Sequence, residues 1–267
     1  MPLTRRNHWE LLVNFTTRNL KLKYKGSILG FLWSLITPLL QMLIYTIVFS
    51  LIIRVETNQP FAVFLLTTQL PWIFFASSLQ MGAGSIVEHS NLVKKVYFPR
   101  ELIPISTLMS NMISFLITLL VLAVFLICYN QTFTAHILLL PLAICLLAAF
   151  TMGLTFITSC LAIFFRDIFH ILEVLLLFWF WSLPIVYPLE YLHKNLPEGY
   201  LWLERLYKMN PMVEILELFR FAFFNTKPYE NWPPLKYILY ASIWALVSLM
   251  AGYWLFKKLE PRFAREI

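Results

Sequence analysis

Residues 102–165 begin "LIPISTLMSNMISFLITLLVLAVFLIC" and reach Phe165 without a single Asp, Glu, Lys or Arg. As one helix, a run of this length would extend about 96 Å at about 1.5 Å per residue. The hydrocarbon core of a bilayer is about 30 Å thick and takes roughly 20 residues to cross. The run therefore predicts two membrane-spanning helices, separated at "YNQTFTAH", residues 129–136.

Four further apolar runs extend this pattern along the chain. They occupy residues 28–53, 61–87, 168–189 and 235–256. The chain contains 60% hydrophobic and 13% charged residues, whereas a soluble domain has about 25% charged residues. We therefore expect an all-α integral membrane protein with six transmembrane helices.

The distribution of basic residues predicts the orientation of these spans. Cytoplasmic loops carry an excess of Lys and Arg close to the spans. With six spans, 14 of the 21 Lys and Arg residues fall on the side that holds both termini. Both termini are therefore predicted to be cytoplasmic. Basic membrane edges account for the net charge of +7, so we expect contact with membrane lipids and no nucleic-acid partner.

The pattern of residues 1–27 predicts an amphipathic helix on the cytoplasmic surface of the membrane. Trp9 begins an apolar series with helical spacing, and Arg18, Lys21 and Lys25 belong to a basic series on another face. Such a helix lies along the bilayer with its lysines toward anionic headgroups. A plain topology anchor is the alternative interpretation.

A short charged segment, "NLVKKVYFPRE" at residues 91–101, interrupts the uncharged runs. It predicts a short cytoplasmic helix over about residues 86–98, with Ser85 and Glu88 as a capping box and Pro99 at its end. Its apolar positions are Leu92, Val93, Val96 and Tyr97. Its polar positions are Glu88, Asn91, Lys94 and Lys95. The apolar face needs a partner, which could be the chain's own span ends, the lipid surface or another protein.

Residues 190–234 are too apolar and too long for an ordinary connection. They predict two short helices within residues 200–224, and Asn210 followed by Pro211 marks the start of the second. These helices are too short to cross the bilayer. Re-entrant segments are tolerated where they pack on protein or line a wet cavity, so we expect two short re-entrant helices on the extracytoplasmic side.

The chain lacks the sequence motifs of an enzyme. It has no G-x-x-x-x-G-K-[ST] phosphate loop and no H-E-x-x-H, and its five histidines show no ligand spacing. We expect no catalytic residue, metal or cofactor on this chain. Arg166, Asp167 and Glu173 are functional candidates as charges close to a span, although local pairing at the membrane interface is the alternative.

Aromatic residues within the predicted spans could line a passage for a sugar polymer, because aromatic faces can contact sugar rings. The candidates are Trp33, Tyr45, Trp72, Phe75, Phe178, Trp181 and Tyr187. Packing against lipid or in the protein core is the alternative for each of them.

Several segments together resemble the permease subunits of ABC-2 type exporters, in particular exporters of lipid-linked O-antigen and teichoic acid polysaccharides. The segments are "LKLKYKGSILGFLWSLITPLL" at 20–40, "LPWIFFASSL" at 70–79, "LVKKVYFPRELIPI" at 92–105, "FFRDI" at 164–168, "LPIVYP" at 183–188, "NPM" at 210–212 followed by Arg220, and "LEPRFAREI" at 259–267. The resemblance covers nearly the whole chain.

The resemblance implies an ATP-driven exporter in a bacterial plasma (inner) membrane. Two copies of this chain would form the channel, and two copies of a separate ATPase, which carry ATP and Mg, would bind its cytoplasmic side. Residues 1–27 would be the interface helix, 86–98 the coupling helix that contacts the ATPase, and 200–224 the gate helices. The six-span domain would occupy residues 28–256, with a cytoplasmic tail at 257–267. The substrate would be a lipid-linked polysaccharide, with O-antigen placed first and teichoic acid second.

Other functions remain open at this point. An ABC-2 exporter of a capsule, a small lipid or a drug would share the architecture. A secondary flippase or carrier would work without ATP, and a membrane-embedded transferase would have only Glu173 and His170 as candidate catalytic groups. A neighbouring ABC ATPase gene would argue against the last two alternatives.

Overall fold

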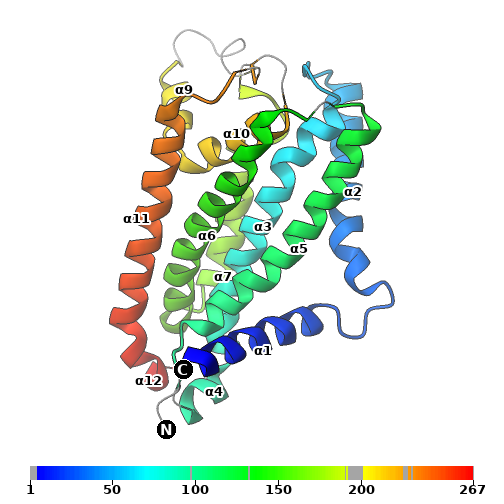
Figure 1. The fold of residues 1–267 in the computed structure, drawn as a ribbon. Coiled ribbons are helices and arrows are strands. Elements are labelled where there is room, and N and C mark those ends of the chain that lie inside the picture. Colours follow the sequence, from blue (N-terminus) through cyan, green and yellow to red (C-terminus); the bar gives the residue numbers. More distant parts are fainter. Residues whose placement is uncertain are drawn as a thin grey trace.

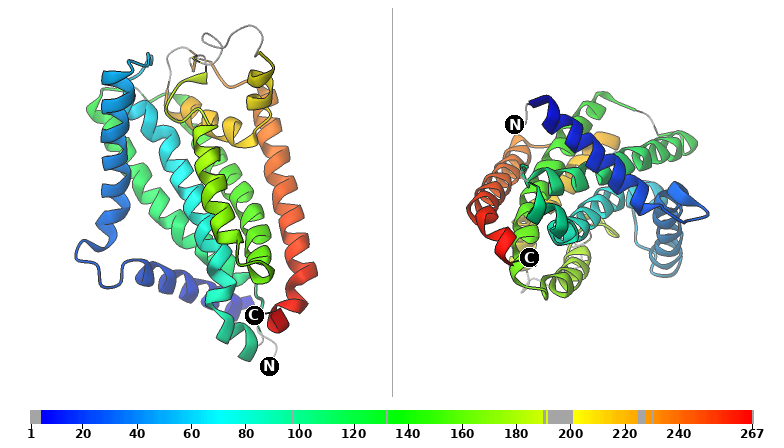
Figure 2. Two further views of the ribbon diagram at one scale, coloured as in Figure 1. Left: turned by 180° about the vertical axis from the view of Figure 1, so that it is seen from behind. Right: turned by 90° about the horizontal axis from the view of Figure 1, so that it is seen from below.

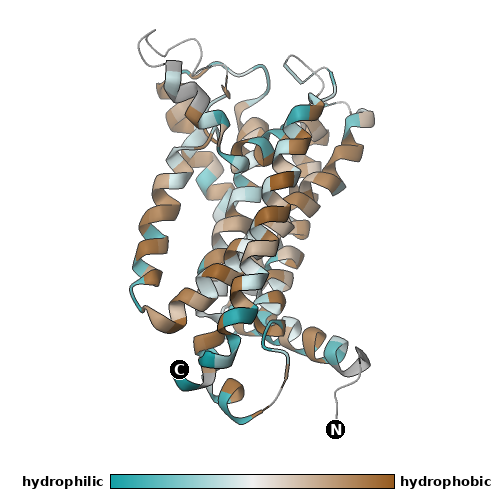
Figure 3. Cartoon of the chain, turned by 90° about the vertical axis from the view of Figure 1, so that its left-hand side faces the viewer, coloured by the Kyte–Doolittle hydropathy of each residue, from teal (hydrophilic) through white to brown (hydrophobic). Residues whose placement is uncertain are grey.

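The computed structural model describes residues 5–96, 98–131, 133–189, 191, 201–224, 228–229 and 231–266. Within these ranges the chain forms helices and no strands. The long helices stand side by side in one bundle (Figure 1). Hydrophobic residues predominate along the bundle, and hydrophilic residues are more frequent at its two ends (Figure 3).

Among the described residues, five helical segments are long and apolar enough to cross a membrane. They are η1–α2–η2 (Gly30–Leu32, Trp33–Tyr45 and the π-helical Thr46–Ile52), α3 (Phe61–Glu88), α5 (Leu102–Cys128), η3–α6 (Ala135–Leu138 and Leu139–Phe164) and α11–η5 (Leu235–Leu259 and Glu260–Arg262). The predicted division of residues 102–165 into two spans is confirmed, because α5 ends at Cys128 and η3 begins at Ala135.

The remaining predicted span is shorter than expected. Helix α7 covers Ile168–Trp181, which is 14 residues and about 21 Å, whereas the sequence predicted a helix to residue 189. Pro184 explains the early end, because a proline disfavours helical geometry at the residue before it. The Ser182 hydroxyl donates to the Phe178 carbonyl at 2.8 Å and satisfies one carbonyl of the last turn.

Helix α3 is the central helix of the bundle. In its most apolar 18 residues 83% are buried, against 6% in the corresponding part of Gly30–Ile52. Aromatic rings join α3 to its neighbours: Phe74 stacks on Phe115 of α5 at 5.2 Å between centroids, and Phe75 stacks on Phe150 of α6 at 5.9 Å. Helix α2 stands at the edge of the bundle (Figure 1), and Pro38 is its one buried residue.

Helices α6 and α11 pack closely through two glycines. A Cβ atom at Gly252 would meet the backbone of Gly153, and a Cβ atom at Gly153 would meet the backbone of Ser248. Small residues let helix backbones approach in this way within a membrane. The pair α6–α11 therefore depends on the absence of side chains at these positions.

Helix α1 (Arg5–Lys23) crosses one end of the bundle, which is the lower end in Figure 1 and faces the viewer in the right panel of Figure 2. Its Phe15 and Thr16 pack inward, whereas Trp9 is 64% exposed. Three polar contacts join this region to α5: Asn19 to Ser106 at 3.3 Å, Lys23 to Asn111 at 3.1 Å and Tyr24 to Ser114 at 3.5 Å. Helix α1 therefore has one face on α5 and an exposed apolar side chain on another, and its position along a membrane surface stays a prediction.

The chain turns from α1 into α2 at Gly26 and Gly30, which have φ angles of +76° and +50°. Glycine adopts this left-handed region at little cost. The turn lets α1 lie across the bundle while α2 runs along it (Figure 1).

Candidate functional site

Helix α4 (Ser90–Lys95) lies at the lower end of the bundle, between α3 and α5 (Figure 1). The predicted capping box is wrong, because α3 continues through Glu88 and the Ser85 hydroxyl donates to the Gly82 carbonyl at 2.7 Å within that helix. The helix break falls at His89, with φ −98° and ψ 21°. The segment predicted as one helix over 86–98 is therefore the end of α3 followed by a six-residue helix.

The inward face of α4 is occupied by this chain itself. Val93 is 2% exposed and belongs to the hydrophobic core, and Leu92 packs against it. Helix α12 (Phe263–Glu266) also packs against α4. Val96 is 51% exposed, and Tyr97 lies outside the described residues. Of the three partners considered for the apolar face, the chain's own span ends are the one observed for Val93.

The outward face of α4 is polar and basic. Its exposed residues, with the end of α3, are Glu88, Asn91, Lys94, Lys95 and Val96. This surface is the part of the segment that remains accessible to another protein.

An ionic network lies at the same end of the bundle. The Lys257 amine is 2.8 Å from a Glu101 carboxylate oxygen and 3.0 Å from a Glu260 carboxylate oxygen. The Arg100 guanidinium donates to the Glu260 carbonyl at 2.5 Å. The network joins the start of α5 to the end of α11, although exposed ion pairs contribute modestly to stability.

Helix α10 (Pro211–Phe223) lies at the opposite end and packs on α3, α6 and α11. The predicted start is confirmed, because the Asn210 side chain accepts a hydrogen bond from the Met212 backbone N–H at 3.1 Å and Pro211 occupies the first turn. Helix α9 (Leu201–Lys208) precedes it. Residues 212–220 are all buried, so the second of the two predicted short helices packs on protein.

Arg220 anchors α10 inside the protein. Its side chain is fully buried, lies 2.5 Å from the Glu217 carboxylate and donates to the Pro184 carbonyl. Its guanidinium lies 4.0 Å from the centre of the Phe64 ring. The Tyr229 hydroxyl donates to the other Glu217 oxygen at 3.0 Å. Arg220 thus connects α10 to α3 and to the segment that follows α7.

Glu214 occupies the same helix and is 6% exposed. Burial, and then the nearby Glu217 charge, raise the pKa of Glu214 to about 7. Desolvation disfavours the charged carboxylate, so Glu214 changes its protonation state near neutral pH and not in the acidic range.

The candidate channel aromatics divide into three groups, which are buried, partly buried and exposed. Trp72 is 6% exposed and Phe75 is 0% exposed, so both pack in the core, and their prediction as passage residues is corrected. Tyr45 is partly buried and stacks on Phe180. Tyr187 is partly buried and its hydroxyl lies 2.7 Å from that of Tyr207. The exposed candidates are Trp33, Phe178 and Trp181.

The charged candidates near α7 are all on the surface. Arg166, Asp167 and Glu173 are exposed. Asp167 is the N-cap residue of α7, without a side-chain capping bond. These surface positions fit the alternative interpretation of the three residues as charges at the membrane interface.

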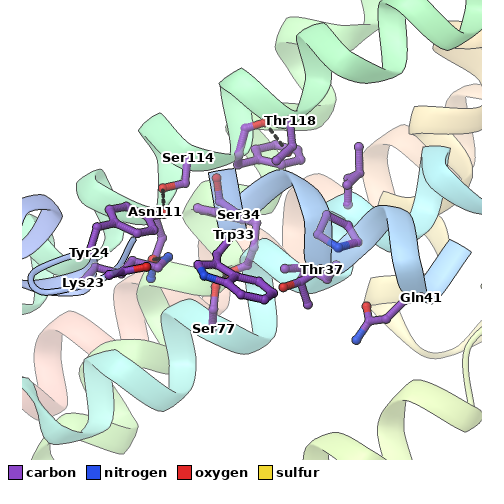
Figure 4. Close-up of a pocket in the computed structure, with 16 residues that line it drawn as sticks. Lys23, Tyr24, Trp33, Ser34, Thr37, Gln41, Ser77, Asn111, Ser114 and Thr118 are labelled. Carbon is purple, nitrogen blue, oxygen red and sulfur yellow. Dashed lines mark hydrogen bonds between the residues drawn. The ribbon is translucent and has the colours of Figure 1, made fainter. Parts of the chain in front are cut away.

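A cavity of about 440 Å³ lies between the end of α1 and helices α2, α3 and α5 (Figure 4). Its polar lining residues are Lys23, Tyr24, Ser27, Ser34, Thr37, Gln41, Ser77, Asn111, Ser114 and Thr118. This cavity was not predicted from the sequence. The available signal was the spacing of Asn111, Ser114 and Thr118, because residues three and four apart share one face of a helix.

Comparison with known proteins identifies the family. The family model described as "ABC-2 type transporter" matches residues 10–224. The chain belongs to the ABC-2 type transporter family. This result confirms the resemblance found in the sequence, and the five long apolar helices fit a multi-pass membrane protein.

Several relatives are similar to this ABC-2 chain over most of their length. The O-antigen export system permease protein RfbA of Myxococcus xanthus is 31% identical over 96% of this chain and 95% of the relative. A protein of the same name from Klebsiella pneumoniae is 34% identical over 96% and 94%. The polysialic acid transport protein KpsM of Escherichia coli is 26% identical over 91% of each chain. The family and these relatives indicate a transport subunit.

Proposed function

We propose that this chain is the transmembrane subunit of an ATP-driven exporter that moves a lipid-linked O-antigen polysaccharide out of the cytoplasm across a bacterial inner membrane. The observation that carries the proposal is the similarity, over 96% of this chain, to O-antigen export permeases. The similarity to a polysialic acid transport protein favours capsule-type polysaccharide as the second candidate, and teichoic acid remains an alternative.

The proposed assembly contains two copies of this chain and two copies of a separate ATPase that carries ATP and Mg. The ATPase contact is the exposed basic face of α4 at Lys94 and Lys95. Helices α1, α4 and α12 share one end of the bundle (Figure 1), which supports a cytoplasmic position for both termini.

The geometry of α4 supports a direct path for motion. Only His89 separates α4 from the central helix α3. Val93 anchors α4 in the hydrophobic core. When ATP binding closes the two ATPases, displacement of α4 passes to α3 through these two connections. The passage for the glycan opens between two copies, along the exposed faces of α2 and α7.

The coupling role is tested by co-purification of the chain with the ABC ATPase encoded nearest to it. We expect Lys94→Glu/Lys95→Glu to lose the ATPase, because the double variant reverses the charge of the exposed α4 face. The matched control is Lys21→Glu/Lys25→Glu, an exposed lysine on α1 and another in the turn that follows it, and this variant should retain the ATPase. Thermal unfolding of each purified chain verifies the fold. If the α4 variant still retained the ATPase, the proposed ATPase contact at α4 would be wrong.

The substrate is tested in cells that lack this chain. We expect surface polysaccharide to disappear, lipid-linked polysaccharide to accumulate inside, and wild-type chain to restore export. Unchanged surface polysaccharide would refute the proposed substrate. Export that continues with a partner ATPase unable to hydrolyse ATP would favour the carrier alternative.

A further inference from the structure

The cavity between α1, α2, α3 and α5 is lined by both polar and apolar side chains. Lys23, Tyr24, Asn111 and Ser114 gather at one end, and Gln41 lies toward the other (Figure 4). The apolar lining residues are Trp33, Pro38, Leu70, Ile73, Phe74 and Phe115. A volume of about 440 Å³ falls in the range of small-molecule sites, roughly 300–1,000 Å³.

Asn111 is an incompletely satisfied group in this cavity. It is 2% exposed, and its Oδ1 accepts a hydrogen bond from the Lys23 amine at 3.1 Å. A lysine amine can only donate, so the amide oxygen must face Lys23 and the amide nitrogen faces elsewhere. That Nδ2 has no hydrogen-bond partner among the described residues. A buried donor without an acceptor is costly, so the site suits a ligand that carries one.

The charge of the lining residues defines the kind of acceptor. Lys23 is the only charged residue among them, and no carboxylate is included. Lys21 and Lys25, which flank Lys23, do not line this cavity and are exposed. An ammonium group beside an unpaired amide N–H and several hydroxyls is a suitable donor set for a phosphate group, because hydrogen bonds between charged partners are the stronger ones.

We propose that this cavity binds the phosphate group of a lipid, with Lys23 and Asn111 Nδ2 donating to the phosphate oxygens. The apolar lining residues, among them Trp33, Phe74 and Phe115, contact the first part of the hydrocarbon chain. Because α1 is an amphipathic helix at the end of the bundle, the site lies at the depth of lipid headgroups. The assignment of this lipid to the carrier end of the exported polysaccharide rests on the proposed function.

The test measures binding of dodecyl phosphate to the full-length chain in nanodiscs, by native mass spectrometry. Dodecanol, which lacks the phosphate, and inorganic phosphate, which lacks the chain, are the two comparison ligands. We expect dodecyl phosphate to bind at least about tenfold more tightly than either, because each part contributes to the complex.

Variants then locate the site. Asn111→Asp keeps an acceptor for Lys23 but removes the free donor and adds a negative charge, so it should weaken dodecyl phosphate binding at least about tenfold without loss of the fold. Lys23→Gln should weaken binding similarly. The controls are Lys21→Gln, on the exposed face of α1, and Ser110→Ala, a buried α5 position that does not line the cavity.

Three results would overturn the proposal: equal binding of dodecanol, equal binding of inorganic phosphate, or unchanged binding by Asn111→Asp. The proposed export function has a separate readout, surface polysaccharide in cells. Phosphate-lipid binding in a protein whose loss leaves surface polysaccharide intact would sustain the site and refute the function. Normal export of polysaccharide by a chain that does not bind dodecyl phosphate would sustain the proposed function and refute the site.

Discussion

At the residue scale, the buried Arg220 has the largest predicted effect on stability. Arg220→Met would leave the Glu217 carboxylate without its cation and the Pro184 carbonyl without this donor. Removing one partner of a buried ion pair costs about 3–5 kcal/mol. We expect a large fall in the midpoint of thermal unfolding. Arg262→Met, at an exposed position near the other end, should change it little, and equal midpoints for the two variants would contradict the anchoring role.

Glu214 makes the stability of the protein depend on pH. Its pKa is raised to about 7 in the folded chain by burial, against about 4.3 in an unfolded chain. A carboxyl group whose pKa is raised on folding contributes its full stabilisation at pH values below its pKa in the unfolded chain. That stabilisation is lost as the pH rises through its pKa in the folded chain. We expect the unfolding midpoint to fall between pH 5 and pH 8, and Glu214→Gln to reduce that fall. An identical pH dependence in the variant would show that Glu214 is ionised throughout.

Local signals at single residues were read from the sequence with mixed success. Asn210 and Pro211 start α10 as predicted, because a capping bond involves only neighbouring atoms. Ser85 carries the same kind of signal, yet it lies inside α3. Helix α3 continues three residues past Ser85 to Glu88, and tertiary packing buries both Ser85 and Val93. A cap motif cannot reveal such burial, so the sequence left open which of the three partners covers the apolar face of α4.

At the element scale, the contact between α6 and α11 predicts intolerance to side chains at its glycines. Gly252→Leu would force a side chain into the Gly153 backbone. Overpacking costs typically about 1–3 kcal/mol, so we expect a lower unfolding midpoint and less folded protein after purification. Ala251→Leu adds the same side chain one residue away on an exposed surface. A Gly252→Leu chain as stable as Ala251→Leu would disprove the close contact.

Long helices were predictable because apolar length is a strong signal in one dimension. The runs at 61–87 and 235–256 became α3 and α11 within a few residues. The run at 168–189 did not, since composition alone hides the effect of Pro184 on the residue before it. Helix α4 is likewise shorter than predicted, because its start depends on the end of α3.

At the scale of the whole molecule, the exposed α2 predicts contact between two copies. In the most apolar 18-residue part of Gly30–Ile52, only 6% of residues are buried within one chain. In a chain with its native cysteines replaced, Leu43→Cys should therefore form cross-linked dimers on oxidation. Ile243→Cys is similarly exposed on α11, at the opposite edge of the bundle, and should remain monomeric on a denaturing gel. The reverse result would place the interface between copies at α11.

Helix pairing was the part of the fold that the sequence could not supply. Periodicity shows that a helix has a face but not which helix covers it. Lys23 and Asn111 are 88 positions apart, and neither has a local pattern that indicates the other. The cavity between α1, α2 and α5 depends on this pairing, so it became visible only in three dimensions.

The contacts between α1 and α5 also bear on how the protein is made. Asn19–Ser106, Lys23–Asn111 and Tyr24–Ser114 join residues 87, 88 and 90 positions apart. Ribosomes add about 5–20 residues per second, so α1 is synthesised roughly 5 to 20 seconds before its partner. During that interval two apolar segments enter the bilayer while α1 waits on its surface. Because α1 is amphipathic, it can stay at the bilayer surface until α5 has been synthesised and can pack against it.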